Sequence, residues 1–331
     1  ANVKYKGRLQ PGKMFLVDIN EGRIISDEEL KVKVTTQKPY KNWVKENQVN
    51  LKGLPESNYR FESDLDSLLD RQVAFGYTVE DIKFIMAPMI GTAMEATGSM
   101  GNDSPLAVLS QKTQLLFNYF KQLFAQVTNP AIDSIREEIV MSMEVTLGRE
   151  RNLLDESPEH CQKLKIEHPI LTGREMDKIR YLDQEGLKPI VLSTLFPVNQ
   201  GEHGMEQAIK TLCQNASKAI EEGATLLILS DKGVDKENAA LPSLLATAGV
   251  HHHLLRERTR TRVGLVVETG EAREMMHFAL LIGYGAGAVY PYLAYETVAE
   301  IANEAIYIEK IDEETAISNF IKATRKGLFK I

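Results

Sequence analysis

Thr225-Leu-Leu-Ile-Leu-Ser230 is a short, continuously apolar stretch that ends on a polar residue, and it decides how the second half of this chain folds. Similar stretches occur at 189–194, 263–269 and 287–292. Amphipathic helical patterns separate them at 205–220, 240–249 and 271–283, and another follows at 296–305. Apolar strands that alternate with helices are typical of a parallel sheet covered on both faces.

The number of these repeats limits the architecture. A closed eight-stranded barrel needs eight strand-and-helix units, and the second half of the sequence shows about half of them. We therefore predict an α/β protein in which a mostly helical N-terminal half packs on a parallel βα sheet. The sheet is expected to be open, or to form a truncated or distorted TIM-like barrel.

The first half of the chain carries separate local signals. Residues 13–26 predict a hairpin, because apolar stretches flank the turn Asn20-Glu-Gly22. Ser26 and Glu29 have the spacing of a capping box, which predicts that a helix begins there. Helical patterns follow at 64–75 and 79–89. The strongest lies at 110–127, and we assign its apolar stripe to core packing.

Parallel sheets bind ligands beyond the carboxyl ends of their strands, so the residues there are candidate binding positions. Lys232 among them has the chemistry of a base or a Schiff-base amine. The sequence shows neither a second cation nor an apolar surrounding for it, which favours a capping, interdomain or vestigial role. The positions are Ser193, Thr194, Phe196, Asn199, Ser230, Asp231, Lys232, Glu268, Thr269, Tyr290, Pro291 and Tyr292.

Two clusters that resemble ligand sites are interpreted as structural. Neighbouring side chains of His251-His-His253 point in different directions around a helix, which disfavours one shared metal ion. Gly283-Tyr-Gly-Ala-Gly287 follows a helix and precedes a strand, whereas a dinucleotide-binding loop needs the reverse order.

Two charged clusters also receive structural interpretations. Glu268, Glu271 and Glu274 are expected to cap the helix at 271–283, where negative charge favours the helix dipole. Arginines at 256, 258, 260 and 262 predict a solvated or ion-paired turn before a strand, with a phosphate or partner contact as the alternative.

Composition excludes several classes of function. A chain of 331 residues that is 43% hydrophobic can bury a large core, as one large domain or two intimate halves. The net charge of -7 and the lack of a long basic run argue against nucleic-acid or anionic-membrane partners. The apolar stretch 275–295 is interrupted by glycines and Pro291, so we interpret it as a buried helix and strand. Two distant cysteines, Cys161 and Cys213, with no secretory signal, predict a reducing, cytoplasmic location.

Several specific stretches carry a resemblance to a known family. Gly98-Ser-Met-Gly-Asn-Asp-Ser-Pro-Leu-Ala-Val-Leu-Ser110 is followed by an aromatic segment and Gln126-Val-Thr-Asn-Pro-Ala-Ile-Asp133. The others are Gly7-Arg-Leu-Gln-Pro-Gly-Lys-Met-Phe-Leu-Val-Asp18, His168-Pro-Ile-Leu171, Lys188-Pro-Ile-Val-Leu-Ser-Thr-Leu-Phe196 and Arg325-Lys-Gly-Leu-Phe-Lys-Ile331. Together they resemble glutamate synthase, in the region between its glutamine amidotransferase domain and its FMN-binding synthase domain.

This resemblance implies a central linking domain with two covalent neighbours. Residues 1–35 would form a linker and hairpin from the amidotransferase domain, 36–165 a helical part, and 166–331 a parallel βα part leading to the FMN domain. In the whole enzyme, glutamine is hydrolysed in one neighbour. Transient ammonia then travels internally to the other and adds to 2-oxoglutarate, and the imine is reduced to glutamate. Ferredoxin and a nicotinamide cofactor stay open as electron donors.

The reaction centres are expected outside this chain. An amidotransferase of this type needs an N-terminal cysteine nucleophile, and the chain begins with Ala1, so we expect that site upstream. An iron–sulfur cluster needs more thiolates than two cysteines supply. FMN and the cluster are therefore implied only for the full-length enzyme. We expect no catalytic residue, cofactor or metal in this chain, and no activity from it alone. For a plant or alga the resemblance implies the plastid stroma.

Two polar turns are the candidate ammonia tunnel. The resemblance places them at Ser99, Met100, Gly101 and Asn102, and at Thr128, Asn129 and Asp133. Short polar side chains and exposed carbonyls suit a wall that conducts a small polar molecule. The glycines at 98 and 101 would let the first turn move when the flavin domain binds its substrate. Two alternatives stay open. In the first, these residues merely seal the domain interface. In the second, the chain is a stand-alone TIM-like enzyme that binds a phosphate or flavin ligand and uses Lys232 or Glu268 as its catalytic group.

Overall fold

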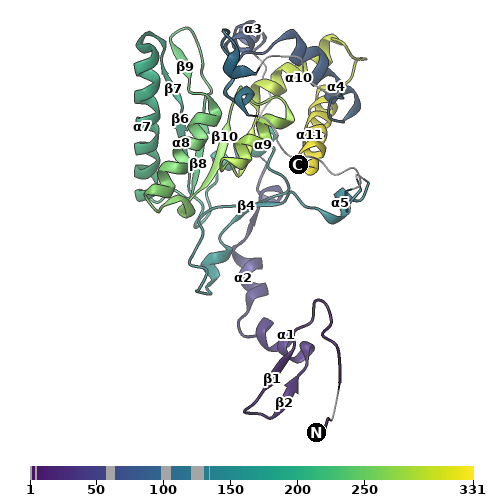
Figure 1. The fold of residues 1–331 in the computed structure, drawn as a ribbon. Helices are drawn as coiled ribbons and strands as arrows, with labels where there is room; N and C mark the ends of the chain where they lie inside the picture. The colour runs from purple at the N-terminus through teal and green to yellow at the C-terminus, as the bar shows by residue number, and fades with distance from the viewer. Residues whose placement is uncertain (1, 4–5, 57–63, 98–105, 121–129, 134) are drawn as a thin grey trace.

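A parallel sheet with the strand order β11-β10-β8-β6 forms the centre of the molecule (Figure 1). Its strands coincide with the four predicted apolar stretches, so the parallel βα architecture of the second half is confirmed. The structure is a computed structural model that describes residues 2–3, 6–56, 64–97, 106–120, 130–133 and 135–331. The strands are β6 (Pro189–Ser193), β8 (Leu226–Ser230), β10 (Gly264–Glu268) and β11 (Ala288–Tyr290).

The two faces of this sheet belong to different hydrophobic clusters, because side chains alternate along a strand. Leu227 and Leu229 of β8 pack with the helices α7 and α8 on one face. Ile228 of β8 packs on the other face in a cluster that includes Met176 and Ile179 of α6 and buried side chains of the N-terminal half, such as Leu68 and Phe75. The helices are α6 (Gly173–Arg180), α7 (Gly201–Glu221) and α8 (Ser243–Arg256).

The remaining helices of the second half complete the alternation. Those expected at 271–283 and 296–305 are present with shifted ends, while the helix before the C-terminus was not predicted from the sequence. Asp312 accepts a hydrogen bond from the Thr315 N–H at 2.8 Å and so caps that last helix. The helices are α9 (Met275–Gly283), α10 (Tyr292–Glu304) and α11 (Glu313–Lys330).

The N-terminal hairpin lies at the far end of the molecule from the sheet (Figure 1). Its strands pair antiparallel with Leu16 opposite Ile25, which confirms the predicted hairpin. The Ser26 hydroxyl accepts the Glu29 N–H at 3.2 Å, but the Glu29 carboxylate pairs with Arg23, so only half of the predicted capping box forms. The elements are β1 (Leu16–Asp18), β2 (Arg23–Ile25), α1 (Asp27–Thr35) and α2 (Tyr40–Asn47).

The other predicted helices of the first half are also present. Residues 64–75 contain α3 (Leu65–Ala74), whose N-terminus is capped by Asp64. The pattern at 79–89 forms one π-helical stretch, η2 (Asp81–Met86), that continues as α4 (Ala87–Thr92).

The prediction of a helix at 110–127 is wrong for residues 110–120, the part of this range that the structure describes. Residues 110–120 contain one 3-10 turn, η4 (Leu116–Tyr119), between residues in extended conformation. The core-packing prediction for the apolar stripe holds in part: Leu115, Leu116 and Phe120 are partly buried against the core, but Tyr119 is 51% exposed. The buried side chain is Phe117, which lies outside the stripe, is 2% exposed and stacks on the His277 ring with centroids 4.3 Å apart. These tertiary contacts outweigh the helical propensity of the segment. Residues 121–127 lie outside the described part of the chain.

Short strands and turns connect these parts. Two small sheets, β3-β5-β4 and β7-β9, were not predicted from the sequence. The first adds strand structure to the 36–165 part that we expected to be helical. The remaining elements are β3 (Val49–Asn50), η1 (Leu51–Gly53), η3 (Ala107–Leu109), α5 (Glu137–Val140), β4 (Val145–Leu147), η5 (Pro158–Cys161), β5 (Leu164–Ile166), β7 (Leu195–Pro197), η6 (Val198–Gln200), β9 (Asn238–Ala240) and η7 (Arg260–Arg262).

Arg273 joins the two halves of the molecule. Its guanidinium donates to the Phe75 carbonyl at 3.2 Å, to the Gly76 carbonyl at 2.7 Å and to the Asp81 carboxylate at 3.0 Å. The same group lies over the Tyr77 ring, 4.2 Å from its centroid, and the side chain is only 3% exposed. Arg273 follows β10, whereas the acceptors lie after α3, so one buried cation connects the sheet to the helical half.

Contacts on either side of Arg273 strengthen this junction. Arg71 on α3 pairs with Glu296 on α10 at 2.6 Å. The Tyr77 hydroxyl donates to the Gly270 carbonyl at 3.0 Å. A Cβ at position 270 would lie 2.6 Å from the Phe75 ring, so the close approach of the two segments requires glycine there.

Asp231, on the sheet side, binds the start of the loop after β10 that carries Arg273. Asp231 follows β8, is 2% exposed, and accepts hydrogen bonds from the Thr269 hydroxyl at 2.5 Å and the Gly270 N–H at 2.9 Å. Burial raises the pKa of Asp231 to about 8, with Glu271 as a lesser contribution.

Among the described residues, no helix combines the length and apolarity needed to cross a membrane. The apolar stretch 275–295 forms α9, β11 and the start of α10, as the sequence interpretation expected.

Replacing Arg273 by Met should lower the free energy of unfolding by about 3–5 kcal/mol, because Asp81 and two backbone carbonyls lose a buried donor. Urea denaturation followed by circular dichroism measures this change. Arg136→Met is the control, since Arg136 is 73% exposed in its ion pair with Asp133 and should cost less than about 1 kcal/mol. Equal losses for the two variants would show that Arg273 does not hold the halves together.

The contribution of Asp231 to the stability of the chain should fall as pH rises from about 4 to about 8. Its folded-state pKa lies above the unfolded value, so its contribution is fully present below the unfolded pKa and is lost as pH approaches the folded one. Asp231→Asn does not titrate and should flatten the curve, by up to about 1.4 kcal/mol per pH unit. Parallel curves for the two proteins in urea titrations at several pH values would contradict the assignment.

Candidate functional site

The last residues of the sheet strands form one row at the carboxyl edge. Ser193 is the register partner of Ser230, Ser230 of Glu268, and Glu268 of Tyr290. Register partners in a parallel sheet point to the same face, so these side chains project together. The structure thus confirms that the strand ends chosen from the sequence meet at one edge.

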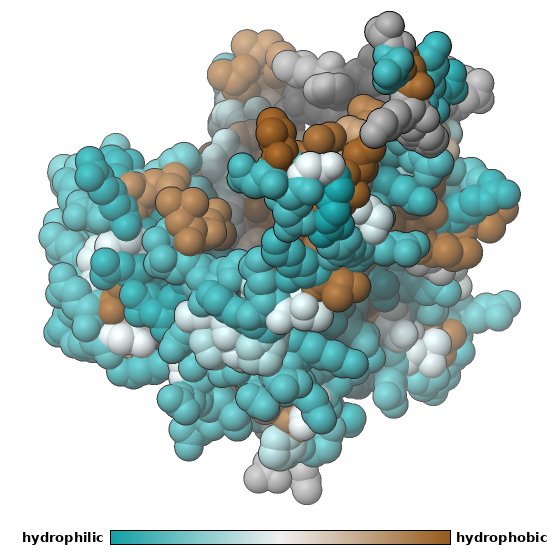
Figure 2. All heavy atoms as spheres, turned by 90° about the horizontal axis from the view of Figure 1, so that it is seen from below, coloured by the Kyte–Doolittle hydropathy of each residue, from teal (hydrophilic) through white to brown (hydrophobic). Residues whose placement is uncertain are grey.

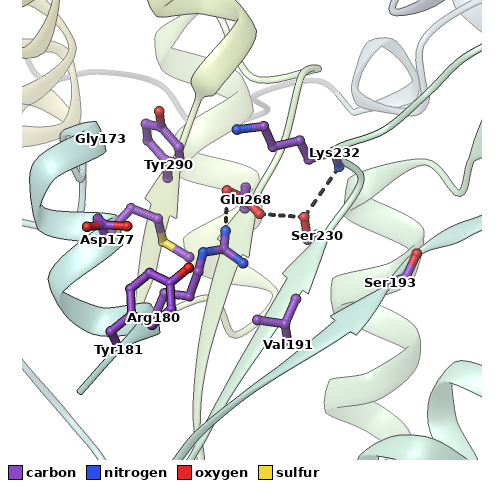
Figure 3. A pocket seen from close by; sticks show the side chains of 11 residues that line it. Gly173, Asp177, Arg180, Tyr181, Val191, Ser193, Ser230, Lys232, Glu268 and Tyr290 are labelled. Atoms are coloured by element: carbon purple, nitrogen blue, oxygen red, sulfur yellow. Dashed lines mark hydrogen bonds and ion pairs between the residues drawn. The ribbon is translucent and has the colours of Figure 1, made fainter. Parts of the chain in front are cut away.

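This row lines a cavity of about 520 Å³. Helix α6 forms the opposite wall, and the loop after β8 contributes Lys232 (Figure 3). The lining residues are Gly173, Met176, Asp177, Arg180, Tyr181, Val191, Ser193, Ser230, Lys232, Glu268 and Tyr290.

Glu268 is the buried charge at the centre of the cavity wall. It is 2% exposed, and its carboxylate accepts a hydrogen bond from Arg180 at 2.6 Å and a short one from the Ser230 hydroxyl. The Ser230 oxygen in turn accepts the Lys232 backbone N–H at 3.3 Å. A buried carboxylate is tolerated when it is paired and hydrogen-bonded, so this network offsets the cost of burying the Glu268 charge. It also holds the Arg180 side chain in place.

Lys232 does not have the surroundings of an activated amine. The residue is exposed, and its ammonium lies 6.0 Å from the centroid of the Tyr292 ring. An activated lysine needs an apolar pocket or a close, uncompensated cation. The exposed Lys232 side chain is not enclosed in an apolar pocket, and the charge of Arg180, which lines the same cavity, is paired with Glu268. The geometry therefore favours binding over catalysis at Lys232.

Other strand-end residues chosen from the sequence stabilise the edge instead of facing the cavity. The Thr194 hydroxyl donates to the Ser230 carbonyl at 3.1 Å, and Thr269 binds Asp231. Phe196 lies in β7 and packs in the cluster beneath α7, and Asn199 lies in η6. Pro291 and Tyr292 begin α10 and are buried.

Sequence analysis missed the contribution of α6, which supplies Asp177 and Arg180. A local signal for this helix exists: Thr172 and Glu175 form a complete capping box. Thr172 Oγ1 accepts the Glu175 N–H at 3.3 Å, and the Glu175 carboxylate accepts the Thr172 N–H at 2.8 Å. That spacing could have predicted α6, but not that its last residue would reach Glu268.

The predicted capping role of the glutamates around residue 271 is wrong for two of them. Glu268 is the pocket carboxylate described above. Glu271 accepts hydrogen bonds from the Ser243 N–H at 2.7 Å and its hydroxyl at 2.6 Å, so it caps α8. Glu274 occupies the N-cap position of α9, as expected, but its side chain makes no capping hydrogen bond and pairs with His277 at 3.0 Å instead.

Two histidines of 251–253 bind different partners, one of which belongs to the arginine cluster. His251 Nδ1 accepts from Arg260 Nε at 2.9 Å, whereas His253 Nε2 lies 2.8 Å from the Ser217 hydroxyl. Arg260 also donates to the Val263 carbonyl at 2.7 Å, which confirms that its turn precedes a strand as predicted. Within the part of the chain that the structure describes, no cluster of three or more His, Cys, Asp or Glu side chains is arranged to hold a metal ion.

Most candidate tunnel residues lie outside the described residues. These are Ser99, Met100, Gly101, Asn102, Thr128 and Asn129. Asp133 is described: its carboxylate accepts the N–H groups of Ile135 and Arg136, both at 3.0 Å, and pairs with the Arg136 side chain. Asp133 therefore fixes the turn that leads into α5.

A larger cavity of about 1470 Å³ lies between α11 and the start of α6. Met141 and Met143, after α5, also line it. Burial and the nearby Arg325 hold the pKa of His168, at its edge, below the usual value.

Comparisons with known proteins assign the chain to a family. Residues 70–331 match the family described as Glutamate synthase central domain, and residues 1–43 match Glutamine amidotransferases class-II. Among relatives, the Glutamate synthase (NADPH) large chain of Bacillus subtilis is 46% identical over 330 residues, which cover 100% of this chain and 21% of the relative.

Two further relatives extend the comparison beyond bacteria. Glutamate synthase (NADH) of Schizosaccharomyces pombe is 41% identical over 340 residues, covering 99% of this chain and 16% of its own. The chloroplastic ferredoxin-dependent glutamate synthase of Oryza sativa is 40% identical over 346 residues, which cover 100% of this chain and 21% of the relative. The chain thus spans about a fifth of the length of these relatives. It belongs to the glutamate synthase central domain family.

Proposed function

We propose that this chain is the central linking part of a glutamate synthase, and that it holds a glutaminase domain and an FMN-containing synthase domain at a fixed separation. The observation that carries the proposal is that one continuous chain matches class-II amidotransferases at residues 1–43 and the central domain family at 70–331. The N-terminal hairpin therefore belongs to the amidotransferase side, and the sheet to the connecting side.

The parent reaction divides between the two neighbours. Water hydrolyses the glutamine amide to glutamate and ammonia in one domain. In the other, ammonia condenses with 2-oxoglutarate and releases water, and the resulting imine accepts two electrons and two protons to become glutamate. FMN and an iron–sulfur cluster belong to the rest of the parent enzyme, since Cys161 and Cys213 alone are too few thiolates for a cluster. Ferredoxin or a nicotinamide cofactor supplies the electrons.

The exposed apolar surface around α5 supports covalent neighbours. Ile135 and Ile139 are 85% and 84% exposed, and Met141, which follows α5, lines the cavity beneath α11. Figure 2 shows that hydrophobic side chains gather in patches on a face that is otherwise mainly hydrophilic. Such patches are typical of surfaces that another domain covers.

The sheet also supports a barrel ancestry. Its strands are parallel, alternate with helices, and end in a pocket at their carboxyl edge, as in barrel enzymes. Helix α6 packs on the face that would be the inside of a barrel. We propose that this half is a truncated barrel whose interior is filled by α6.

The ammonia passage is proposed to follow the two polar turns at Ser99, Met100, Gly101 and Asn102, and at Thr128, Asn129 and Asp133. Asp133, the last of these residues, is 45% exposed, and its hydrogen bonds fix the turn that follows it at the start of α5. The proposed location is the cytoplasm, or the plastid stroma in a plant or alga, as the name of the rice relative indicates for that protein.

Thr128→Trp in the full-length enzyme should uncouple the two half-reactions. The indole would block the passage, so glutaminase activity continues while glutamine-dependent glutamate formation falls by about tenfold or more, which corresponds to about 1.4 kcal/mol. Synthesis from added ammonium salt should persist. The measurement compares glutamine consumed with 2-oxoglutarate consumed.

Thr211→Trp is the matched control, because Thr211 is exposed on α7 and belongs to neither turn. It should leave the stoichiometry unchanged. Normal coupling in Thr128→Trp, or equal uncoupling in both variants, would show that the second turn does not line the ammonia passage.

A further inference from the structure

The pocket at the carboxyl edge of the sheet holds cationic donors that the protein does not use. The Arg180 NH2 group binds Glu268, but its Nε and NH1 groups have no acceptor among the described residues. The Lys232 ammonium likewise has no hydrogen-bond acceptor among the described residues, and it lies over the Tyr292 ring. Figure 3 shows both side chains entering the same cavity from opposite walls.

The guanidinium is positioned before any ligand arrives. Glu268 is buried and fixed by the Ser230 hydroxyl, and it orients the planar Arg180 fork. A fixed fork loses little conformational entropy when it binds a second carboxylate, and it recognises carboxylates through paired hydrogen bonds.

The remaining lining limits the class of ligand. A volume of about 520 Å³ suits a small molecule, and Met176, Val191 and Tyr181 offer apolar contact along one side. Asp177 also lines the cavity, and its carboxylate has no partner within the described structure. With Glu268 and Asp177 both present, a phosphate dianion is repelled more strongly than a single carboxylate.

We propose that this pocket binds a small carboxylate-bearing metabolite, with the carboxylate held by Arg180 and Lys232. An amino-acid ligand gains an additional contact, because its ammonium group faces Asp177. This site is separate from the proposed ammonia passage, and binding to it is measurable without any turnover of the parent enzyme.

Calorimetric titration of the 331-residue chain tests the proposal with three probes: L-glutamate, glutarate and inorganic phosphate. Glutarate matches L-glutamate except for the ammonium group. The expected order of affinity is L-glutamate, then glutarate, then phosphate. Lys232→Gln should weaken both carboxylate probes at least tenfold, because a hydrogen bond to a charged group is lost.

Two variants make the outcome specific. Lys236→Gln changes an exposed lysine of the same loop that does not line the cavity, and it should bind like the original chain. Asp177→Asn should weaken L-glutamate, which loses the partner of its ammonium group, and should not weaken glutarate, which loses only a repulsive charge. Urea denaturation of each variant verifies that it is folded.

Clear results would overturn the proposal. Absence of heat with both carboxylate probes in the millimolar range would show that the pocket does not bind carboxylates. Equal affinity in Lys232→Gln and Lys236→Gln would show the same. Phosphate binding as tight as glutarate removes the carboxylate assignment. Glutarate binding as tight as L-glutamate keeps the carboxylate site and removes the role of Asp177. None of these results depends on whether glutaminase and synthase activities are coupled.

Discussion

The buried guanidinium of Arg273 is the constraint on which the arrangement of the two halves depends. It comes from the loop after β10 and satisfies two backbone carbonyls and the Asp81 carboxylate of the helical half. Asp231 holds the same loop from the sheet side, and Gly270 lets Phe75 approach it closely. A rigid joint at this edge also gives the pocket a fixed wall, because Glu268 lies at the end of the same strand.

The sequence predicted the sheet well, because a strand that is buried on both faces must be apolar at every position. Leu226 to Leu229 are all nearly inaccessible, and that requirement made β8 visible without a structure. The meeting of Ser193, Ser230, Glu268 and Tyr290 at one edge followed from the same reasoning. Which face each residue occupies depended on register, and only the structure supplied it.

The misassigned parts depended on contacts between distant residues. The stripe at 110–127 has helical spacing, yet Phe117 reaches the core through a 3-10 turn because His277 offers it a stacking partner. Glu271 caps a helix that begins at Ser243, far away in the chain. Arg180 enters the pocket because Glu268 lies opposite it, 88 positions later. No local pattern encodes such pairings, so local rules found the elements but not these partners.

The architecture supports a division between a connecting surface and a separate pocket. The hairpin, the exposed side chains of α5 and the cavity under α11 suit contact with covalent neighbours, whereas the strand edge forms a small charged site. The central claim is that ammonia passes between those neighbours without entering solvent. Its most direct test supplies the full-length enzyme with glutamine labelled by nitrogen-15 in the amide, together with excess unlabelled ammonium. The account predicts that the label enters the new glutamate almost undiluted, and dilution to the level of the ammonium in solution would contradict it.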